Sequence, residues 1–222
     1  MTATPGSPIQ VEHYSDLLCV WAYVAQIRVD ELRHTFGDQL KLKYRFVNVF
    51  GDTGHKFEGW QDRGGLAGYR EHVHKVAAGF DHVVLHQDVW REDVPASSLS
   101  PHHFLRAVSL ACGEEALERA AWAMRLAFFR DGRNIARREV QLAVLGELDL
   151  PQAEILAAMD DGRAQAALAE DLRLAVNEGV TGSPTLVFNE GRQHIYGNVG
   201  YRVIEANMRE LLERPSDQCS WC

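Results

Sequence analysis

The first 46 residues switch between two hydrophobic periods. Residues 9–14 alternate apolar and polar side chains, which is typical of a strand that buries one face. Apolar side chains then recur at spacings of three and four: Ala22, Ala25, Val29, Leu32 and Phe36. This second period predicts an amphipathic helix over residues 21–36, which Gly37 is placed to end. Residues 40–46 alternate again, so the chain opens with a β-α-β unit whose two strands should pair in parallel.

From residue 66 to residue 179 the strand pattern almost disappears. Residues 51–65 are rich in Gly, Asp and aromatic side chains and predict a loop. Helices are expected after this loop at 66–80, 101–112, 114–130, 135–148, 151–159 and 163–178. Strands return at 185–188 and 193–196, where the turn 189–192 predicts a hairpin. A last helix is expected over 201–213.

The order β-α-β, a block of helices, then β-β-α predicts an α/β fold with one small open sheet. This is the layout of a thioredoxin-like fold with a large all-helical domain inserted between the βαβ and ββα halves. We expect residues 1–60 and 180–213 to form the thioredoxin-like core and residues 61–179 to form the helical insertion domain. Residues 214–222 form a C-terminal tail that ends in Cys-Ser-Trp-Cys.

Composition narrows the classes of function. The 222 residues are 46% apolar and 24% charged, which suits a globular protein with a sizeable core. The net charge of −8 argues against a nucleic-acid partner, because no basic patch is available to neutralise phosphates. No apolar run approaches the ~20 residues that span a bilayer, and the N-terminus lacks the features of a secretory signal. We therefore expect a cytoplasmic protein with no membrane partner, in which the four cysteines are thiols.

Cys19 stands where the first strand gives way to the first helix, within the sequence CVWA. Free backbone N–H groups and the helix dipole at such a junction favour an anion, which lowers the pKa of a thiol and makes it nucleophilic. In a CxxC redox motif the resolving cysteine would occupy the position of Ala22. The nearby Asp16 and His13 either tune the pKa of Cys19 or are simply solvated. A buried, inert cysteine is the alternative for Cys19 itself.

A second landmark precedes the third predicted strand. Ser183 and Pro184 lie in the segment GVTGSPT, and a proline is tolerated at the first position of a strand. A cis Ser183–Pro184 bond would turn the chain sharply there. Taken alone, the segment also fits a plain loop with a trans proline. Together with the strand-Cys-helix junction and the helical block, it favours the cis form.

Three stretches of the sequence resemble the DsbA-like thioredoxin family, and in particular its cytoplasmic FrnE-like branch. They are DLLCVWAY around Cys19, GVTGSPTLVF around Pro184 and AFFRDGRNIA within the helical block. The resemblance implies that Cys19 is the nucleophile and that Pro184 is a cis-proline facing it. It also implies that the Ser183–Pro184 backbone helps to hold a thiol or peptide substrate. Two positions depart from the family's Cys-Pro-Trp-Cys motif: Val20 replaces its proline, and Ala22 replaces its resolving cysteine.

The leading interpretation is a DsbA-like thiol oxidoreductase with a monothiol active site. Cys19 would form a mixed disulfide with a small thiol or a protein disulfide substrate, and it cannot close a local disulfide without a thiol at position 22. The rival from the same fold is a glutathione-dependent transferase or isomerase of the kappa-class type, which carries a serine at the nucleophile position. A third interpretation is a catalytically silent binding protein.

We expect no tightly bound cofactor, with glutathione or another low-molecular-weight thiol as a candidate co-substrate. A homodimer is compatible with the sequence.

The remaining candidates are less specific. Trp21 is expected to be a surface aromatic beside the reactive cysteine, or else a core residue, and Cys112 lies in an apolar helical stretch that predicts burial. Cys219 and Cys222 could supply a resolving thiol from the tail, contribute two metal ligands, or be incidental. The histidine pairs 72/74 and 102/103 lack the spacing of a zinc-protease helix motif, so a surface or packing role is favoured and no metal site is expected.

Overall fold

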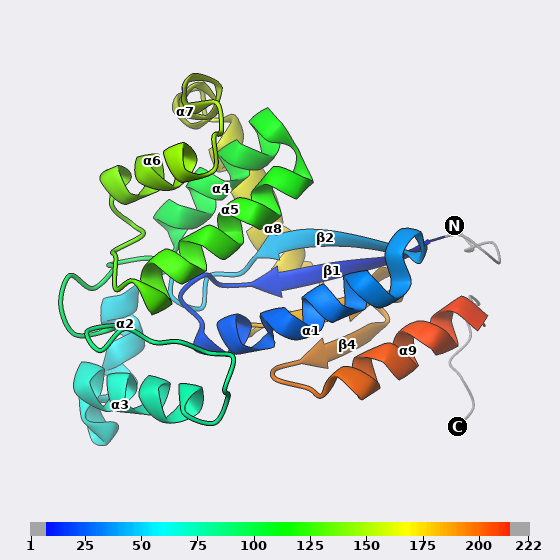
Figure 1. The fold of residues 1–222 in the computed structure, drawn as a ribbon, viewed down its shortest axis with the longest axis horizontal. Helices are drawn as coiled ribbons and strands as arrows, with labels where there is room; N and C mark the ends of the chain where they lie inside the picture. Colours follow the sequence, from blue (N-terminus) through cyan, green and yellow to red (C-terminus); the bar gives the residue numbers. More distant parts are fainter. Residues whose placement is uncertain (1–7, 214–222) are drawn as a thin grey trace.

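The computed structural model describes residues 8–213, which form a mixed α/β fold around one four-stranded sheet (Figure 1). The strands lie in the order β2-β1-β3-β4. Their bounds are β1 (Ile9–Ser15), β2 (Leu40–Phe46), β3 (Thr185–Phe188) and β4 (Gln193–Tyr196). β1 pairs with β2 in parallel, and β3 pairs antiparallel with both β1 and β4. The predicted parallel pair and the predicted hairpin are therefore both confirmed.

Helices cover both faces of this sheet. α1 (Val20–Phe36) and α9 (Tyr201–Glu213) pack on one face, and α8 (Arg163–Asn177) lies behind the other (Figure 1). All four residues of β3 are buried, as expected for a central strand that is covered on both sides. The strand residues that pack against α1 and α9 are apolar and alternate along their strands: Ile9, Val11, Leu186 and Phe188. The alternation in the sequence thus reports which side of each strand faces the helices.

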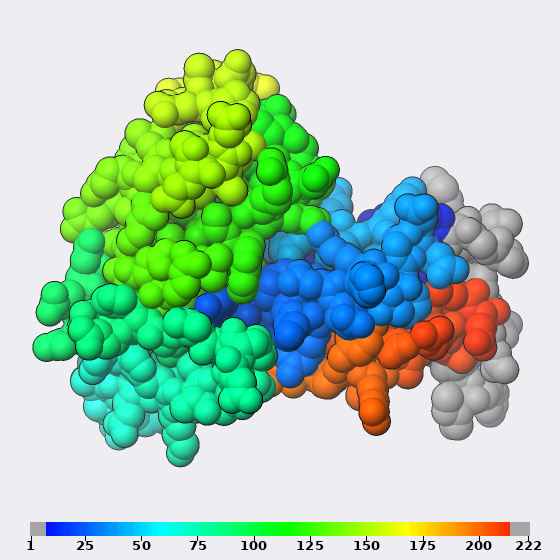
Figure 2. All heavy atoms as spheres, in the orientation of Figure 1, coloured from blue at the N-terminus to red at the C-terminus, as the bar shows by residue number. Residues whose placement is uncertain are grey.

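The chain between β2 and β3 is helical and occupies one end of the molecule (cyan to yellow in Figure 2). Besides α8, its helices are α2 (Thr53–Glu58), α3 (Gly65–Ala77), α4 (Leu99–Cys112), α5 (Glu114–Arg125), α6 (Arg138–Glu147) and α7 (Gln152–Asp160). One hydrophobic cluster runs from the start of α1 into this segment and includes Val20, Val73, Leu105 and Leu117. The sheet unit and the helical segment therefore share a core. The domain boundaries at residues 60 and 180 stay a prediction.

Two stretches of the helical segment differ from the sequence prediction. Residues 51–65, expected as a loop, contain α2 and a short 3-10 turn at Gln61–Arg63. Asp52 caps α2, because its side chain accepts a hydrogen bond from the His55 N–H over 3.0 Å. The helix expected over 114–130 ends at Arg125 and widens into a π-helical turn at Leu126–Arg130. Neither feature leaves an apolar period in the sequence.

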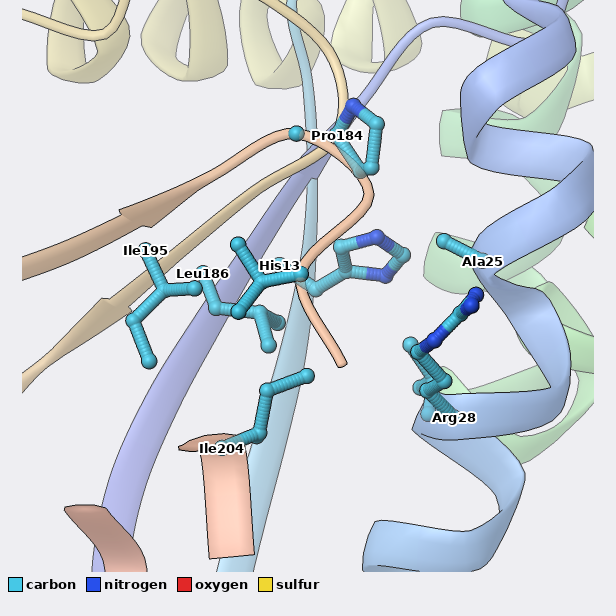
Figure 3. A pocket seen from close by; sticks show the side chains of 10 residues that line it. His13, Ala25, Arg28, Pro184, Leu186, Ile195 and Ile204 are labelled. Carbon is cyan, nitrogen blue, oxygen red and sulfur yellow. The ribbon is translucent and has the colours of Figure 1, made fainter. Parts of the chain in front are cut away.

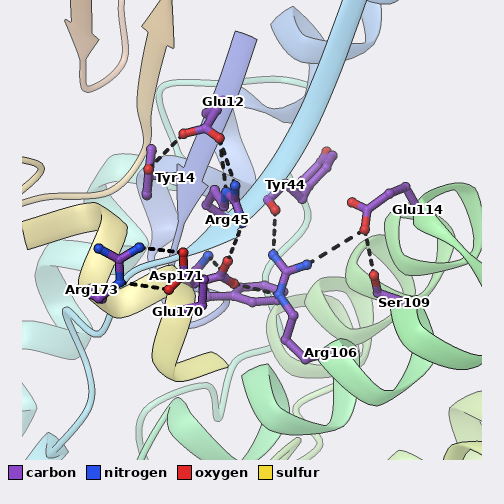
Figure 4. Close-up of polar contacts among 11 residues, drawn as sticks. Glu12, Tyr14, Tyr44, Arg45, Arg106, Ser109, Glu114, Glu170, Asp171 and Arg173 are labelled. Atoms are coloured by element: carbon purple, nitrogen blue, oxygen red, sulfur yellow. Dashed lines mark hydrogen bonds and ion pairs between the residues drawn. The ribbon is translucent and has the colours of Figure 1, made fainter. Parts of the chain in front are cut away.

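A buried ion network joins the helical segment to the edge of the sheet (Figure 4). Asp171 on α8 accepts hydrogen bonds from Arg106 on α4 at 2.6 Å and from Arg45 on β2 at 3.1 Å. Arg45 also binds Glu12 on β1 at 2.9 Å. The Asp171 carboxylate further accepts the Phe46 N–H at 3.3 Å. The network therefore satisfies a backbone donor at the outer edge of β2, where an uncovered strand would expose it.

Candidate functional site

Cys19 lies at the point where β1 turns into α1. It precedes the first helical residue, has an extended backbone and is only 6% exposed. Its thiol donates a hydrogen bond from Sγ to the carbonyl oxygen of Ser183 over 3.1 Å. The Ser183–Pro184 bond is cis, as the sequence predicted. Two motifs that are 164 residues apart in the sequence therefore meet at one sulfur atom.

The surroundings of Cys19 act against ionisation of its thiol. Burial raises the pKa of Cys19 above its usual value, so the lowering expected from a helix N-terminus is wrong. The Ser183 side chain and the backbone N–H groups of Ala22 and Trp21 do favour the thiolate, but desolvation outweighs them. The negative charge of Asp16 adds to the effect of burial. The resting form of Cys19 is therefore the protonated thiol, bonded to the Ser183 carbonyl.

Asp16 fixes the turn that carries the thiol. Its carboxylate is fully buried and accepts hydrogen bonds from the Leu18 N–H at 2.9 Å and from the Phe50 N–H and the Ser98 hydroxyl at 2.8 Å each. Burial raises the pKa of Asp16 to about 6, while these hydrogen bonds favour its charged form. Asp16 is thus no solvated residue, and it holds a buried carboxylate three residues before Cys19.

A family model of the DSBA-like thioredoxin domain matches residues 10–209. The chain belongs to this family. The matched range begins in β1 and ends in α9, so it contains both the Cys19 turn and the Pro184 loop. The FrnE-like branch stays a prediction. A search of curated proteins gave no sequence match.

Solved structures of DsbA-type proteins share the fold at low sequence identity. A probable DsbA oxidoreductase from Streptomyces coelicolor superposes with a TM-score of 0.74 at 19% identity, covering 96% of this chain and 94% of its own. The cytosolic disulfide reductase DsbM from Pseudomonas aeruginosa gives a TM-score of 0.65 at 20% identity, covering 90% and 98%. A 2-hydroxychromene-2-carboxylate isomerase gives 0.66 at 17% identity, covering 95% and 100%. Because oxidoreductases and an isomerase share it, the fold alone does not choose the reaction.

The positions beside Cys19 differ in burial in this DSBA-like chain. Val20 and Ala22 are 1% and 0% exposed. The side chain at position 22, where a resolving cysteine would stand, therefore faces the core. Trp21 is half-buried, and its ring packs edge-on against Phe80 at 6.4 Å between ring centroids. Trp21 therefore combines the two expectations, since it flanks the site and also packs on the hydrophobic core.

The other cysteines of the DSBA-like chain have different surroundings. Cys112 ends α4 and is partly exposed at the margin of the core, so its predicted burial is only partial. Cys219 and Cys222 lie outside the described residues. Among residues 8–213, no group of three or more His, Cys, Asp or Glu side chains is placed to hold a metal ion. The helices of this same part of the chain are all too short or too polar to cross a membrane.

Two buried polar residues of the helical segment support the Cys19 turn and were missed by the sequence reasoning. His102 on α4 is 0% exposed, and its Nε2 accepts the Leu17 N–H at 3.1 Å. Arg125, the last residue of α5, is 1% exposed and donates hydrogen bonds to Ser15 and, at 3.0 Å, to Gln26. The sequence signal that could have identified His102 and Arg125 is a polar residue on the apolar face of a predicted helix. For His102 the sequence favours a surface or packing role over a metal-ligand role, but it does not place the ring at the Cys19 turn.

Proposed function

We propose that the protein exchanges thiols and disulfides through a single cysteine, Cys19. The Cys19 thiolate attacks one sulfur of a disulfide substrate. The S–S bond of the substrate breaks as the new bond to Cys19 forms, and the leaving thiolate takes up the proton that Cys19 gave up. The observation that supports this proposal is the contact of the Cys19 sulfur with the Ser183 carbonyl, beside the cis bond to Pro184.

The buried thiol is ionised only when a substrate reaches it. At rest, the S–H group is held by the Ser183 carbonyl and burial keeps the pKa of Cys19 high. An incoming disulfide displaces this hydrogen bond, and the N–H groups of Trp21 and Ala22 then favour the sulfur anion. The thiol is therefore protected from ionisation, and from the oxidation that thiolates undergo, until it is used.

A second thiol has to release the mixed disulfide, because Ala22 offers none. We propose glutathione or another low-molecular-weight thiol as this co-substrate. Its thiolate attacks the substrate sulfur of the mixed disulfide. A new S–S bond between the co-substrate and the substrate forms as the bond to Cys19 breaks, and Cys19 leaves as a thiolate that takes up the proton of the attacking thiol. The DsbM structure with GSH shares the fold of this chain, at a TM-score of 0.65 and 20% identity.

Reduced protein mixed with glutathione disulfide should gain one glutathione on Cys19. Mass spectrometry of the digested protein locates the adduct. Cys19→Ser should lose this adduct, whereas Cys112→Ser should form it as the intact chain does. If glutathione disulfide labels Cys112 and leaves Cys19 unlabelled, the exchange reaction is wrong and the catalytically silent binding protein is favoured.

The tail cysteines have a separate test. If Cys219 or Cys222 resolves the mixed disulfide, a preformed Cys19–glutathione adduct should release glutathione without added thiol. The double variant Cys219→Ser/Cys222→Ser keeps the length of the tail and should release it several times more slowly. Equal release rates in the two proteins, followed by chromatography of free glutathione, leave both tail cysteines without a catalytic role.

Ala22 also favours a second candidate, the glutathione-dependent transferase or isomerase. In that reaction the Cys19 S–H donates a hydrogen bond to the sulfur of bound glutathione, and no bond forms between the two sulfurs. Cys19→Ser keeps such a donor but cannot form a mixed disulfide. Glutathione-dependent activity that survives in Cys19→Ser would therefore select this candidate over thiol exchange.

A further inference from the structure

A small cavity adjoins the cis-proline, between α1, β3 and the loop that leads into α9 (Figure 3). Its volume is about 20 Å³, and one water needs about 10–15 Å³. Most of its walls are apolar and include Ala25, Val29, Leu186 and Ile204. Pro184 is part of the same wall, so the cavity borders the Cys19 site.

One polar side chain in the wall of the cavity has no hydrogen-bond partner among the described residues. His13 of β1 is 1% exposed, and in the described part of the chain neither ring nitrogen has a hydrogen-bond partner. Burial lowers the pKa of His13 to about 3, so the ring is neutral at pH 7 and carries one N–H donor. Figure 3 shows the imidazole pointing toward α1, where Ala25 and Arg28 lie. A buried unpaired donor costs free energy that a polar ligand in the cavity would offset.

Arg28 brings a positive charge to the same cavity. It is half-buried on α1, and among residues 8–213 its guanidinium contacts no carboxylate. Its hydrogen bond to the Val24 carbonyl is long, at 3.4 Å. The positive charge of Arg28 is therefore available to an anionic ligand at the cavity that it lines. Apolar walls, an unpaired donor and an unpaired cation together favour a small anionic group.

We infer that Arg28 binds a carboxylate of the thiol substrate at this cavity, with the His13 N–H as a second donor. The inference rests on the thiol exchange proposed for Cys19. The substrate sulfur would lie beside Ser183, whose carbonyl contacts the Cys19 sulfur, and the carboxylate would lie beyond Pro184, which lines the cavity. The substrate class is then a low-molecular-weight thiol or disulfide that carries a carboxylate.

The test compares three disulfides that differ in charge. Glutathione disulfide carries carboxylates, bis(2-hydroxyethyl) disulfide is neutral and cystamine is cationic. The rate constant of Cys19 adduct formation is measured with each by rapid mixing, acid quenching and mass spectrometry. Arg28→Met should lower the rate with glutathione disulfide about five- to tenfold, leave the neutral disulfide unchanged and raise the rate with cystamine. Arg173→Met removes the same charge from an exposed ion pair on α8 and should change none of the three rates.

Two results would overturn the inference and leave thiol exchange intact. One is an unchanged rate of Arg28→Met with glutathione disulfide. The other is an equal loss of rate with the neutral disulfide, which would assign Arg28 to the sulfur chemistry or to the fold. If none of the three disulfides labels Cys19 of the intact protein, the proposed exchange itself fails, and the inference falls with it.

Discussion

Replacing Asp171 with alanine should lower the free energy of unfolding by about 3–5 kcal/mol. Asp171 is 1% exposed and neutralises Arg106 at 2.6 Å and Arg45 at 3.1 Å (Figure 4). Without it, the side chain of Arg106 is a cation only 5% exposed that has lost its closest carboxylate. The Phe46 N–H also loses its acceptor. The expected cost comes from the uncompensated charge and the unpaired donor, and these exceed the value of the ion pair itself.

Urea unfolding measures this change, and thermal unfolding should show a decrease of about 6–20 °C. Glu170 is a matched control: it precedes Asp171 and accepts two hydrogen bonds from Arg173, but this pair is exposed (Figure 4). Glu170→Ala should leave the midpoint almost unchanged. The double variant Arg106→Met/Asp171→Leu should recover most of the loss, because neither charge then remains buried. Equal midpoints for Asp171→Ala and Glu170→Ala would mean that the buried network does not stabilise the edge of β2.

The strands and helices with a clear apolar period could be predicted from the sequence. The segments 40–46, 185–188, 193–196 and 201–213 have the predicted bounds. Burial of one face imposes the period on 40–46, 193–196 and 201–213, whereas β3 is buried on both faces and is marked by a short apolar run before a turn. α2 was missed, because distant residues hold its first turn. The Thr53 N–H binds the Ala96 carbonyl at 3.1 Å, and its hydroxyl binds the Pro95 carbonyl, 42 positions away, at 2.9 Å. Contacts of that range leave no local pattern in the sequence.

The candidate site, too, could be predicted from the sequence only in part. Cys19 and Pro184 could be predicted because each stands in a short motif at the end of a strand. The burial of the Cys19 turn could not be predicted from the sequence. It depends on Phe50 and Ser98, which bind Asp16 from 34 and 82 positions away along the chain. A cysteine at an exposed helix N-terminus has a lowered pKa. Here the helical segment packs over the turn, so that desolvation dominates and the pKa is raised.

Stability should fall as the pH drops below about 6.5, because two neutral histidines are buried. Burial, with the charge of Arg125 as the next cause, lowers the pKa of His13 and His102 to about 3. Unfolding restores values of about 6.5. Each histidine therefore stabilises the fold fully above about pH 6.5 and loses this contribution as the pH falls toward 3.

Asp16 acts in the opposite sense, because burial raises its pKa to about 6. Its contribution is present below about pH 4 and is lost as the pH rises through 6.

Between about pH 4 and 6, unfolding makes these two histidines take up a proton each and makes Asp16 release one. The net uptake of one proton corresponds to about 1.4 kcal/mol of stability lost per pH unit. His13→Phe removes one histidine proton and keeps an aromatic ring against Tyr44, which His13 contacts at 5.0 Å between centroids. Urea unfolding of this variant should therefore depend on pH less steeply than that of the intact protein, by about 1.4 kcal/mol per pH unit. All groups common to both proteins cancel in this difference.

The control variant is His55→Gln, on the exposed surface of α2, which should keep the pH dependence of the intact protein. Equal slopes for His13→Phe and His55→Gln would mean that His13 binds its proton in the folded protein as readily as in the unfolded one, which a ring buried without a partner should not do.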